Sequence, residues 1–368
     1  MAGSVFGDIF TVSTWGESHG KGLGVVVDGC PAGLPLTEED IQIFLDRRKP
    51  GETKYSTPRK EGDKVEIMSG VFEGKTTGTP ISMIVPNTSQ KSHDYSEIAT
   101  YYRPGHADYT FDEKYGFRDY RGGGRSSGRE TIGRVAAGAI ASKILKEMGI
   151  EVCAYVTSIG DISIDSSKMK KENIEKSPLR MPDLEASAKA EDFLAEQMKN
   201  QDSAGGVIEC VITGVPAGVG EPVFDKLDAA LAQGIMSIGA VKGVEIGDGF
   251  SVAASKGSEN NDAFILGKDG NVEKLTNHAG GILGGMSDGS PIVFRAAFKP
   301  TPSIFQEQQT VNKAGEEISV QIKGRHDPII VPRAVVVVEA MAALTIVDKM
   351  FVGMTSRLDR IVDFYENR

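Results

Sequence analysis

The sequence predicts an α+β fold in which antiparallel sheets pack on helices and one structural unit occurs twice. The predicted strands come in groups and do not alternate strictly with helices, which favours antiparallel sheets over a parallel doubly wound sheet. Short motifs recur in the same order in the two halves, which indicates an internal duplication. A length of 368 residues exceeds one simple core and suggests two domains or one repeated domain. The repeat favours a single domain over residues 1–368, with halves at roughly 1–150 and 200–352.

The first half opens with a predicted strand, turn and helix. Residues 24–28 are a short β-branched run, and the glycines and proline of residues 29–33 form a turn. Thr37 is the expected N-cap of a helix over residues 38–48. The first turn of this helix is acidic, and the helix ends before Pro50.

Two strands and a long helix complete the first half. The strands are predicted over residues 65–72 and 81–85. The helix is predicted over residues 130–148, where apolar side chains recur at helical spacing, and Gly149 is its expected C′ residue. Its small residues Ala136-Ala137-Gly138 would let another helix approach closely.

The second half repeats this order. Residues 207–213 are a predicted strand, residues 214–218 copy the earlier turn 185 positions later, and a helix is predicted over residues 223–233. Gly78-Thr79-Pro80-Ile81 recurs as Gly289-Ser290-Pro291-Ile292, again before a strand. Chance recurrence of such turns in a chain with 44 glycines is the alternative, and the matching order and context favour duplication.

Three further segments are assigned from their composition. Pro332 is expected to start a long helix that reaches Met350, as residues 130–148 close the first half. Residues 164–196 are rich in charge and are interpreted as a solvated face or connection, and residues 255–262 as an exposed loop.

The composition excludes several classes of protein. Hydrophobic residues make up 40% and charged residues 25%, which excludes wholesale disorder, and no apolar run is long enough to span a membrane. A net charge of −10 makes the chain a poor general nucleic-acid binder. Cys30, Cys153 and Cys210 are widely spaced, which argues against disulfides and zinc and predicts small buried hydrophobes. With no signal-like N-terminus, the expected compartment is the cytoplasm, and no metal site is predicted.

Positive charge gathers in two stretches, residues 46–60 and 118–134. Residues 121–131 combine three consecutive glycines, two serines and several arginines immediately before the predicted long helix. Exposed backbone N–H groups and a helix N-terminus form a ready anion site, and arginine binds phosphate and carboxylate bidentately. A surface charge cluster is the plainer alternative. The segment lacks the Gly-Lys-Ser/Thr ending of a P-loop, and one copy is a poor match to an RNA-binding Arg-Gly-Gly tract.

Three histidines, His19, His106 and His326, lie in glycine-containing motifs. Histidine is the usual proton-transfer group near neutral pH, although each taken alone is more often structural. Gly16-Glu17-Ser18-His19-Gly20 has the letters of a hydrolase elbow, but no clear helix follows it, so nucleophilic catalysis by Ser18 is disfavoured.

Together the motifs resemble the chorismate synthase family closely, over residues 7–350. The segments that carry the resemblance are Gly16-Glu17-Ser18-His19-Gly20, Arg103-Pro104-Gly105-His106-Ala107-Asp108, Arg121-Gly122-Gly123-Gly124-Arg125-Ser126-Ser127, Asn277-His278-Ala279-Gly280-Gly281, Lys299-Pro300-Thr301 and Gly324-Arg325-His326-Asp327-Pro328. The resemblance implies a shikimate-pathway lyase that converts 5-enolpyruvylshikimate 3-phosphate to chorismate and phosphate by a 1,4-anti elimination. It further implies a requirement for reduced FMN, a β-α-β sandwich with helices between two antiparallel sheets, and a homotetramer.

The resemblance also implies roles for individual residues. His19 would protonate the departing phosphate, His106 would protonate the reduced flavin, and Asp327 would act beside flavin N5 in removing the C6 proton. The expected substrate-binding residues are Ser18, Arg48, Lys54, Arg103, Arg129, Arg134 and Arg325. The expected flavin-binding residues are Arg125, Ser126, Ser127, Gly239, Ala240, Gly284, Lys299, Pro300, Thr301, Pro302, Ser303 and Arg325.

Two positions depart from the family pattern. Lys54 stands where many relatives have Arg, which keeps the charge but puts bidentate anion binding in doubt. Gly128 replaces a common Ala and should remove no contact. The resemblance leaves open whether NADPH reduces the FMN, because relatives differ in this, and no dinucleotide-binding glycine motif is present.

Two other functions fit the sequence less well than the lyase does. A non-catalytic binder of phosphate or nucleic acid is disfavoured by the net charge of −10 and the three histidine motifs. A kinase or ATPase is disfavoured because the P-loop and kinase signatures are missing. The expected partners are therefore a small-molecule substrate and further copies of the chain, without nucleic acid or membrane.

Overall fold

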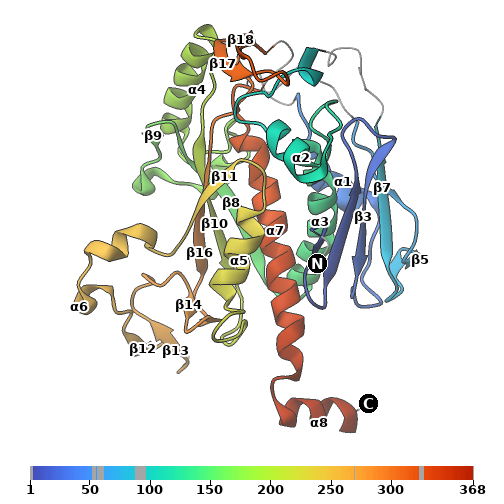
Figure 1. Cartoon of the computed structure of the whole chain (residues 1–368). Helices are drawn as coiled ribbons and strands as arrows, with labels where there is room; N and C mark the ends of the chain where they lie inside the picture. Colours follow the sequence, from blue (N-terminus) through green and yellow to red (C-terminus); the bar gives the residue numbers. More distant parts are fainter. Residues whose placement is uncertain are drawn as a thin grey trace.

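The structure is a computed structural model that describes residues 3–51, 55, 62–87, 97–268, 270–322 and 327–367. Two long helices, α3 (Thr131–Glu147) and α7 (Val331–Val352), pack against each other at its centre (Figure 1). A five-stranded antiparallel sheet lies on each outer side of this helix pair. The predicted combination of helices with antiparallel sheets is confirmed.

The first sheet has the strand order β1-β2-β3-β7-β4 and packs on α3 through β2 and β3. Its strands are β1 (Val5–Phe6), β2 (Thr11–Gly16), β3 (Gly22–Asp28), β4 (Glu66–Ile67) and β7 (Ile81–Pro86). Helix α1 (Glu38–Arg48) lies beside α3 and contacts α7 as well.

The second sheet has the order β11-β16-β10-β8-β9 and packs on α7 through β8 and β10. Its strands are β8 (Glu151–Ile159), β9 (Ile162–Ser163), β10 (Gly206–Thr213), β11 (Val241–Ile246) and β16 (Ile292–Phe298). Helix α5 (Leu227–Met236) contacts α7 and β11, in a place comparable to that of α1 in the first half.

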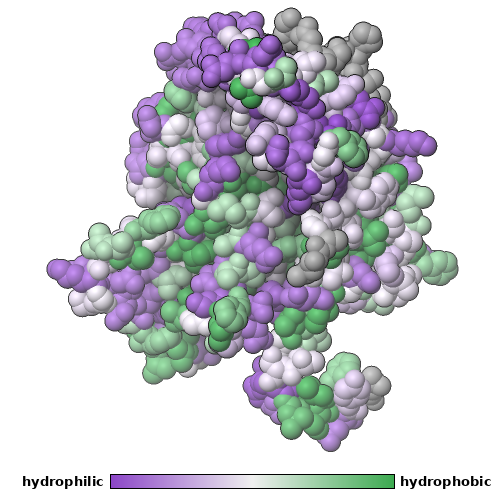
Figure 2. All heavy atoms as spheres, in the orientation of Figure 1, coloured by the Kyte–Doolittle hydropathy of each residue, from purple (hydrophilic) through white to green (hydrophobic). Residues whose placement is uncertain are grey.

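Short elements complete the chain. Four two-residue strands form two hairpins, and two larger hairpins and four more helices decorate the body. These elements are β5 (Val71–Phe72), β6 (Lys75–Thr76), β14 (Ile282–Leu283), β15 (Met286–Ser287), β12 (Phe264–Leu266), β13 (Val272–Lys274), β17 (Glu307–Val311), β18 (Glu317–Gln321), α2 (Asp108–Tyr115), α4 (Leu184–Lys199), α6 (Gly257–Asn260) and α8 (Leu358–Glu366). Helix α8 stands away from the body and shows exposed apolar residues (Figure 2). Within the described ranges, no helix is long and apolar enough to cross a membrane.

The helix predictions hold where capping and packing signals are strong. Thr37 caps α1 in a capping box with Asp40, and acidic residues follow in the first turn. Helix α3 ends at Glu147, and Gly149 has a φ of 72°, as expected for its C′ position. The small residues of α3 bring the two central helices together, because a Cβ on Gly138 would lie 2.3 Å from Cβ of Ala340.

One helix prediction is wrong at its start. The predicted helix over residues 223–233 begins only at Leu227. Val223 adopts a φ of 72°, which a helix cannot contain, and Val223 and Phe224 are 66% and 90% exposed. Val223 and Phe224, although apolar, therefore precede the helix and are not part of its buried face.

The charged segment interpreted as a solvated face or connection contains most of a helix, α4. Asp183 caps α4 by accepting hydrogen bonds from the backbone N–H groups of Glu185 and Ala186. Ala186, Ala190 and Leu194 recur every four residues and are buried, so one stripe of a charged helix faces the core.

Two other predictions need adjustment. The strand over residues 65–72 is broken into β4 and β5, because Gly70 takes a φ of 83° between them. The exposed loop over residues 255–262 holds the short helix α6. Cys30 and Cys210 are buried, as predicted, whereas Cys153 is half-buried.

The two halves share hydrogen bonds as well as element order. Thr76 Oγ1 donates to the carbonyl of Pro31 at 2.6 Å, and Ser287 Oγ donates to the carbonyl of Pro216 at 2.6 Å. In each half this hydroxyl ties the hairpin before one strand to the turn after its neighbour, and β3 pairs with β7 as β10 pairs with β16.

Candidate active site

A cavity of about 1060 Å³, named here the central cavity, lies at the N-terminal ends of α3 and α7. Its wall comes from segments far apart in sequence: residues 103–107, 122–131, 237–242 and 298–303, together with the start of α7. The fold thus brings both predicted basic stretches, through Arg48 and several residues of 122–134, to one cavity.

The N-termini of α3 and α7 both face the cavity, where the backbone N–H groups of Thr131, Arg333 and Ala334 donate to nearby backbone carbonyls. Neither Glu130 nor Ile330, the N-cap residues of α3 and α7, makes a side-chain capping hydrogen bond. The first backbone N–H groups of an α-helix have no partner within the helix, and its N-terminus carries a partial positive charge. Two such ends at one cavity favour a negatively charged ligand.

The loop before α3 depends on its glycines. Gly122, Gly123 and Gly124 have φ values of 66°, 83° and 53°, in the left-handed region. A Cβ on Gly122 would lie 2.1 Å from Cε1 and Nδ1 of His19, so only glycine permits this approach. The loop therefore lies directly against the His19 ring.

His19 and Ser18 adjoin the central cavity through Gly122, although neither lines it. Ser18 Oγ donates to the carbonyl of Gly122 at 3.1 Å and lies 3.2 Å from Nδ1 of His19. The buried hydroxyl thus fixes the imidazole against the loop that does line the cavity.

Arg48 and Arg129 share one carboxylate inside the site. Arg48 NH2 lies 2.5 Å from Asp63 Oδ2, and Arg129 NH2 lies 3.1 Å from Asp63 Oδ1. Arg129 NH2 also donates to Asn87 Oδ1 at 2.9 Å. The Nε of Arg48 is buried and has no hydrogen-bond partner within the described ranges, which leaves a donor for a ligand.

Asp327 is held by an arginine that sequence reasoning did not single out. Arg333 NH1 lies 2.8 Å from Asp327 Oδ2, and Arg333 Nε donates to the carbonyl of Arg48 at 3.1 Å. Burial lowers the pKa of Arg333, and Asp327 opposes that effect. Arg48 and Arg129 contact Asp63, and Arg333 contacts Asp327, so three guanidinium groups and two carboxylates gather at this side of the site.

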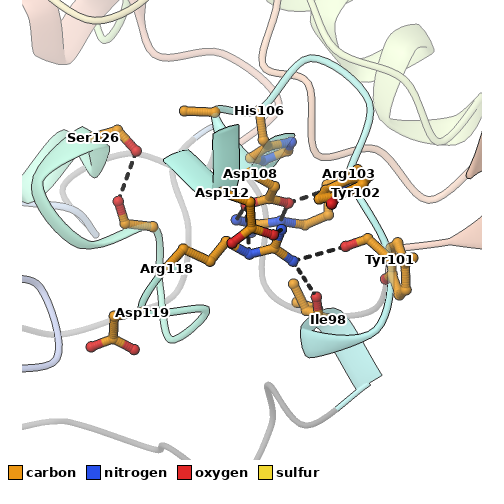
Figure 3. A network of polar contacts seen from close by, with 12 residues as sticks. Ile98, Tyr101, Tyr102, Arg103, His106, Asp108, Asp112, Arg118, Asp119 and Ser126 are labelled. Atoms are coloured by element: carbon orange, nitrogen blue, oxygen red, sulfur yellow. Dashed lines mark hydrogen bonds and ion pairs between the residues drawn. The ribbon is translucent and has the colours of Figure 1, made fainter. Parts of the chain in front are cut away.

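Arg103 lines the cavity, but Asp108 occupies its guanidinium (Figure 3). Arg103 Nε and NH2 donate to the two oxygens of Asp108, each at 2.8 Å. Burial acts to raise the pKa of Asp108, but Arg103 outweighs it, and the pKa lies below its ordinary value. Beside this pair, Arg118 donates to Asp112 and to two backbone carbonyls, which anchors α2 under the cavity wall.

His106 is neutral at neutral pH, because burial, helped by the charge of Arg103, lowers its pKa to about 4. Its Nδ1 lies 2.9 Å from the carbonyl of Pro104, which can only accept, so Nδ1 carries the proton. Nε2 then accepts from the hydroxyl of Ser303 at 2.9 Å. A bound anion nearby would raise this pKa and make His106 a proton donor.

The segment after β16 is fastened to the His106 loop. Lys299 Nζ donates to the carbonyl of Gly105 at 2.9 Å, and a Cβ on Gly105 would lie 2.6 Å from Pro302. Thr301 Oγ1 is buried without a hydrogen-bond partner in the part of the chain that the structure describes. This wall therefore offers a further free hydroxyl to a ligand.

Arg125 and Arg134 brace the wall near α3. Arg125 donates to Thr14 Oγ1 at 2.7 Å, and Arg134 donates to Ser237 Oγ at 2.5 Å. Glu130 accepts from Arg134 at 2.8 Å and pairs with Arg125 at 3.7 Å.

The cavity gathers most of the predicted site residues. Those that line it are Arg48, Arg103, His106, Arg125, Ser126, Ser127, Arg129, Arg134, Gly239, Ala240, Lys299, Thr301, Pro302, Ser303 and Asp327. Ser18, His19, Pro300 and Gly284 do not line it, and Gly284 lies in the β14–β15 turn. Lys54, Arg325 and His326 lie outside the described residues.

Sequence reasoning missed two residues of the site, Asp63 and Arg333. Arg333 follows the predicted helix start at Pro332, where a cation opposes the helix dipole, and that was a usable signal. Asp63 had no such signal. Among the residues that the structure describes, no group of three or more His, Cys, Asp or Glu side chains could hold a metal ion.

The comparisons with known proteins agree with the sequence motifs. The family model described as chorismate synthase matches residues 10–351. Chorismate synthases of Lachnoclostridium phytofermentans and Agathobacter rectalis are 72% and 68% identical, each over 100% of both chains. A solved structure described as "Crystal Structure of Chorismate Synthase" superposes with a TM-score of 0.77 at 33% identity, covering 98% of this chain and 97% of its own. The chain therefore belongs to the chorismate synthase family, and it is an enzyme, a lyase, of that family.

Proposed function

We propose that this enzyme converts 5-enolpyruvylshikimate 3-phosphate to chorismate and inorganic phosphate by a 1,4-anti elimination, with reduced FMN bound in the central cavity. Family membership supports the final step of the shikimate pathway, toward aromatic amino acids. The observation that carries the finer proposal is the enclosed group of arginines at two helix N-termini, beside His106 and Asp327.

The residues present fit two anionic ligands. The substrate carries a phosphate and two carboxylates, and FMN adds a phosphate. The cavity offers several arginine side chains, together with the Nε of Arg48 and the hydroxyl of Thr301, both buried and without a hydrogen-bond partner among the described residues. Its volume of about 1060 Å³ is at the upper end of ligand pockets, roughly 300–1,000 Å³, which supports joint occupancy.

Different walls would hold the two ligands. Arg48 and Arg129, from the first half of the chain, would bind the substrate's anionic groups. Ser126, Ser127 and Lys299 would hold the flavin, with the backbone at residues 239–240 close to it. When bound, reduced FMN supplies electron density to the substrate as phosphate leaves, which an amino-acid side chain cannot do.

The protein's own groups would manage the protons. His19, fixed by Ser18, would donate a proton to the leaving phosphate and so lower the cost of expelling it. Asp327, oriented by Arg333, would take part in removing the proton from C6. His106 would hold or release a proton at Nε2, which faces Ser303 in this structure.

The wider setting is also a proposal. The enzyme would act as a cytoplasmic homotetramer, and NADPH would serve as a reductant of FMN in those relatives that reduce their own flavin. The matched hydroxyl hydrogen bonds of Thr76 and Ser287 support the view that one sandwich-shaped domain arose by duplication of a half.

An anaerobic assay tests the reaction directly. Wild-type enzyme with chemically reduced FMN and 5-enolpyruvylshikimate 3-phosphate should release phosphate and form chorismate in equal amounts. Oxidised FMN should support no turnover. His19→Ala should lower kcat by about 10²–10⁴-fold, the range for lost proton transfer, without changing the fold. If reduced FMN leaves the substrate intact, the proposed reaction is wrong.

A further inference from the structure

We propose that Asp63 is a positioning residue that sets the spacing and orientation of Arg48 and Arg129 for binding the substrate's anionic groups. This inference rests on the proposed function, and no sequence motif or predicted role points to Asp63.

The buried carboxylate of Asp63 lies between the side chains of Arg48 and Arg129, and we call this arrangement the brace. Arg48 NH2 donates to Asp63 Oδ2 at 2.5 Å, and Arg129 NH2 lies 3.1 Å from Asp63 Oδ1 in an ion pair without a hydrogen bond. Asp63 is 4% exposed and Arg48 is 2% exposed. Both arginines line the central cavity, whereas Asp63 does not, so the carboxylate stands behind the groups that meet the ligand.

The backbone at Asp63 is held in a strained conformation. Its φ is 39°, in the left-handed region that non-glycine residues rarely occupy. Gln42 Nε2 donates to the carbonyl of Asp63 at 3.3 Å, and Gln42 Oε1 accepts from the backbone N–H of Val65 at 3.2 Å. One side chain of α1 therefore holds the backbone from the carbonyl of Asp63 to the N–H of Val65.

Two consequences of this carboxylate oppose each other. Its negative charge weakens the attraction of the arginines for an anion, while its two oxygens prevent the guanidinium groups from moving apart by mutual repulsion. If charge mattered more, removing it would tighten substrate binding. If position matters more, removing it would weaken binding, because bidentate anion recognition needs a fixed fork geometry.

Asp63→Asn separates these outcomes. Asn tolerates a left-handed φ, but its amide N–H₂ must face one of the two guanidinium groups, so only one of the two arginines keeps an oxygen of residue 63 as its neighbour. We expect the KM for 5-enolpyruvylshikimate 3-phosphate to rise by at least about 10-fold and kcat/KM to fall by about 10²-fold. The Kd of FMN should stay within about twofold. A merely structural role would reduce the amount of active enzyme, and hence kcat, without changing KM.

Asp63→Glu keeps the negative charge but moves it by the length of one methylene group. This variant is the test to use if Asp63→Asn does not fold. It should raise the KM, by less than Asp63→Asn does, at an unchanged Tm. The matched control is Asp288→Asn, because the side chain of Asp288 is also buried and paired with a cation, Lys274 at 2.7 Å, in a part of the chain that does not line the cavity. Its KM should stay within about twofold of wild type.

Each outcome separates the two proposals. If either Asp63 variant binds substrate as tightly as wild type, or more tightly, the positioning role is refuted while the reaction stands. If wild type does not turn over the substrate, the proposed reaction fails. The brace is then tested with inorganic phosphate as the probe, by calorimetric titration of wild type and Asp63→Asn. Weaker phosphate binding by Asp63→Asn supports the brace, and equal or tighter binding refutes it.

Discussion

Replacing Gly122 by Ala tests whether the glycine loop places His19. The new Cβ would lie 2.1 Å from Cε1 and Nδ1 of His19 and 2.9 Å from Ser18 Oγ. An ordinary contact needs about 3.5 Å, so the imidazole must retreat by more than about 1 Å. A misplacement of about 1 Å can cost 10²-fold in rate, and we expect kcat for Gly122→Ala to fall by about that factor.

The assay is phosphate release under anaerobic conditions with saturating reduced FMN and substrate. Ala at a φ of 66° also strains the backbone by about 1–2 kcal/mol, so thermal unfolding must show that the variant is folded at the assay temperature. FMN binding should change little, because the side chains that the new Cβ would meet, His19 and Ser18, do not line the cavity.

Gly124→Ala is the matched control. Gly124 has a similar left-handed φ of 53°, but its Cβ would meet nothing within 4 Å. It therefore imposes the backbone strain without the collision, and we expect its kcat to stay within a few-fold of wild type. Equal kcat values for the two variants would refute the idea that Gly122 places His19.

The remaining predictions concern stability. His106 has a pKa of about 4 in the folded chain against an ordinary 6.5, so between these values the unfolded chain binds a proton that the native state does not. Acidification from pH 7 to pH 5 should lower the free energy of unfolding of wild type by about 2 kcal/mol more than that of His106→Gln, measured by urea unfolding at the two pH values; equal losses in the two proteins would contradict this. Lys274 is buried 3.1 Å from Asp262 and 2.7 Å from Asp288, so Lys274→Met leaves two buried carboxylates unpaired and should lower the free energy of unfolding by about 3–5 kcal/mol at pH 7. The exposed Lys256→Met should lower it by less than about 1 kcal/mol, and a similar loss in both variants would refute the argument.

The sequence predicted those elements whose signals are local. Thr37 and the acidic turn after it place the start of α1, and Gly149 marks the end of α3. The prediction failed at Val223, because a left-handed φ at a β-branched residue is imposed by the surrounding fold and not by local preference. It failed at α4 because a charged helix with a narrow apolar stripe resembles a solvated connection when only net charge is considered.

The site was predictable to the extent that motifs carry it. His106 and Asp327 belong to such motifs, and both line the cavity. Asp63 belongs to none, because its role follows from a contact with Arg129, 66 positions away, that only the folded chain creates. Arg333 was missed because its value depends on the position of Asp327 after folding.

Because Gly138 packs closely against Ala340, residues far from the ligands can affect catalysis. Helices α3 and α7 both begin at the site, and each half of the chain contributes one of them. Arg333 of α7 donates to the carbonyl of Arg48 at the end of α1, so the two halves of the chain are also joined at the cavity. A side chain larger than hydrogen at position 138 would push α3 and α7 apart. It would change catalysis by altering the gap between two intact halves, while every residue that touches substrate remained in place in the sequence.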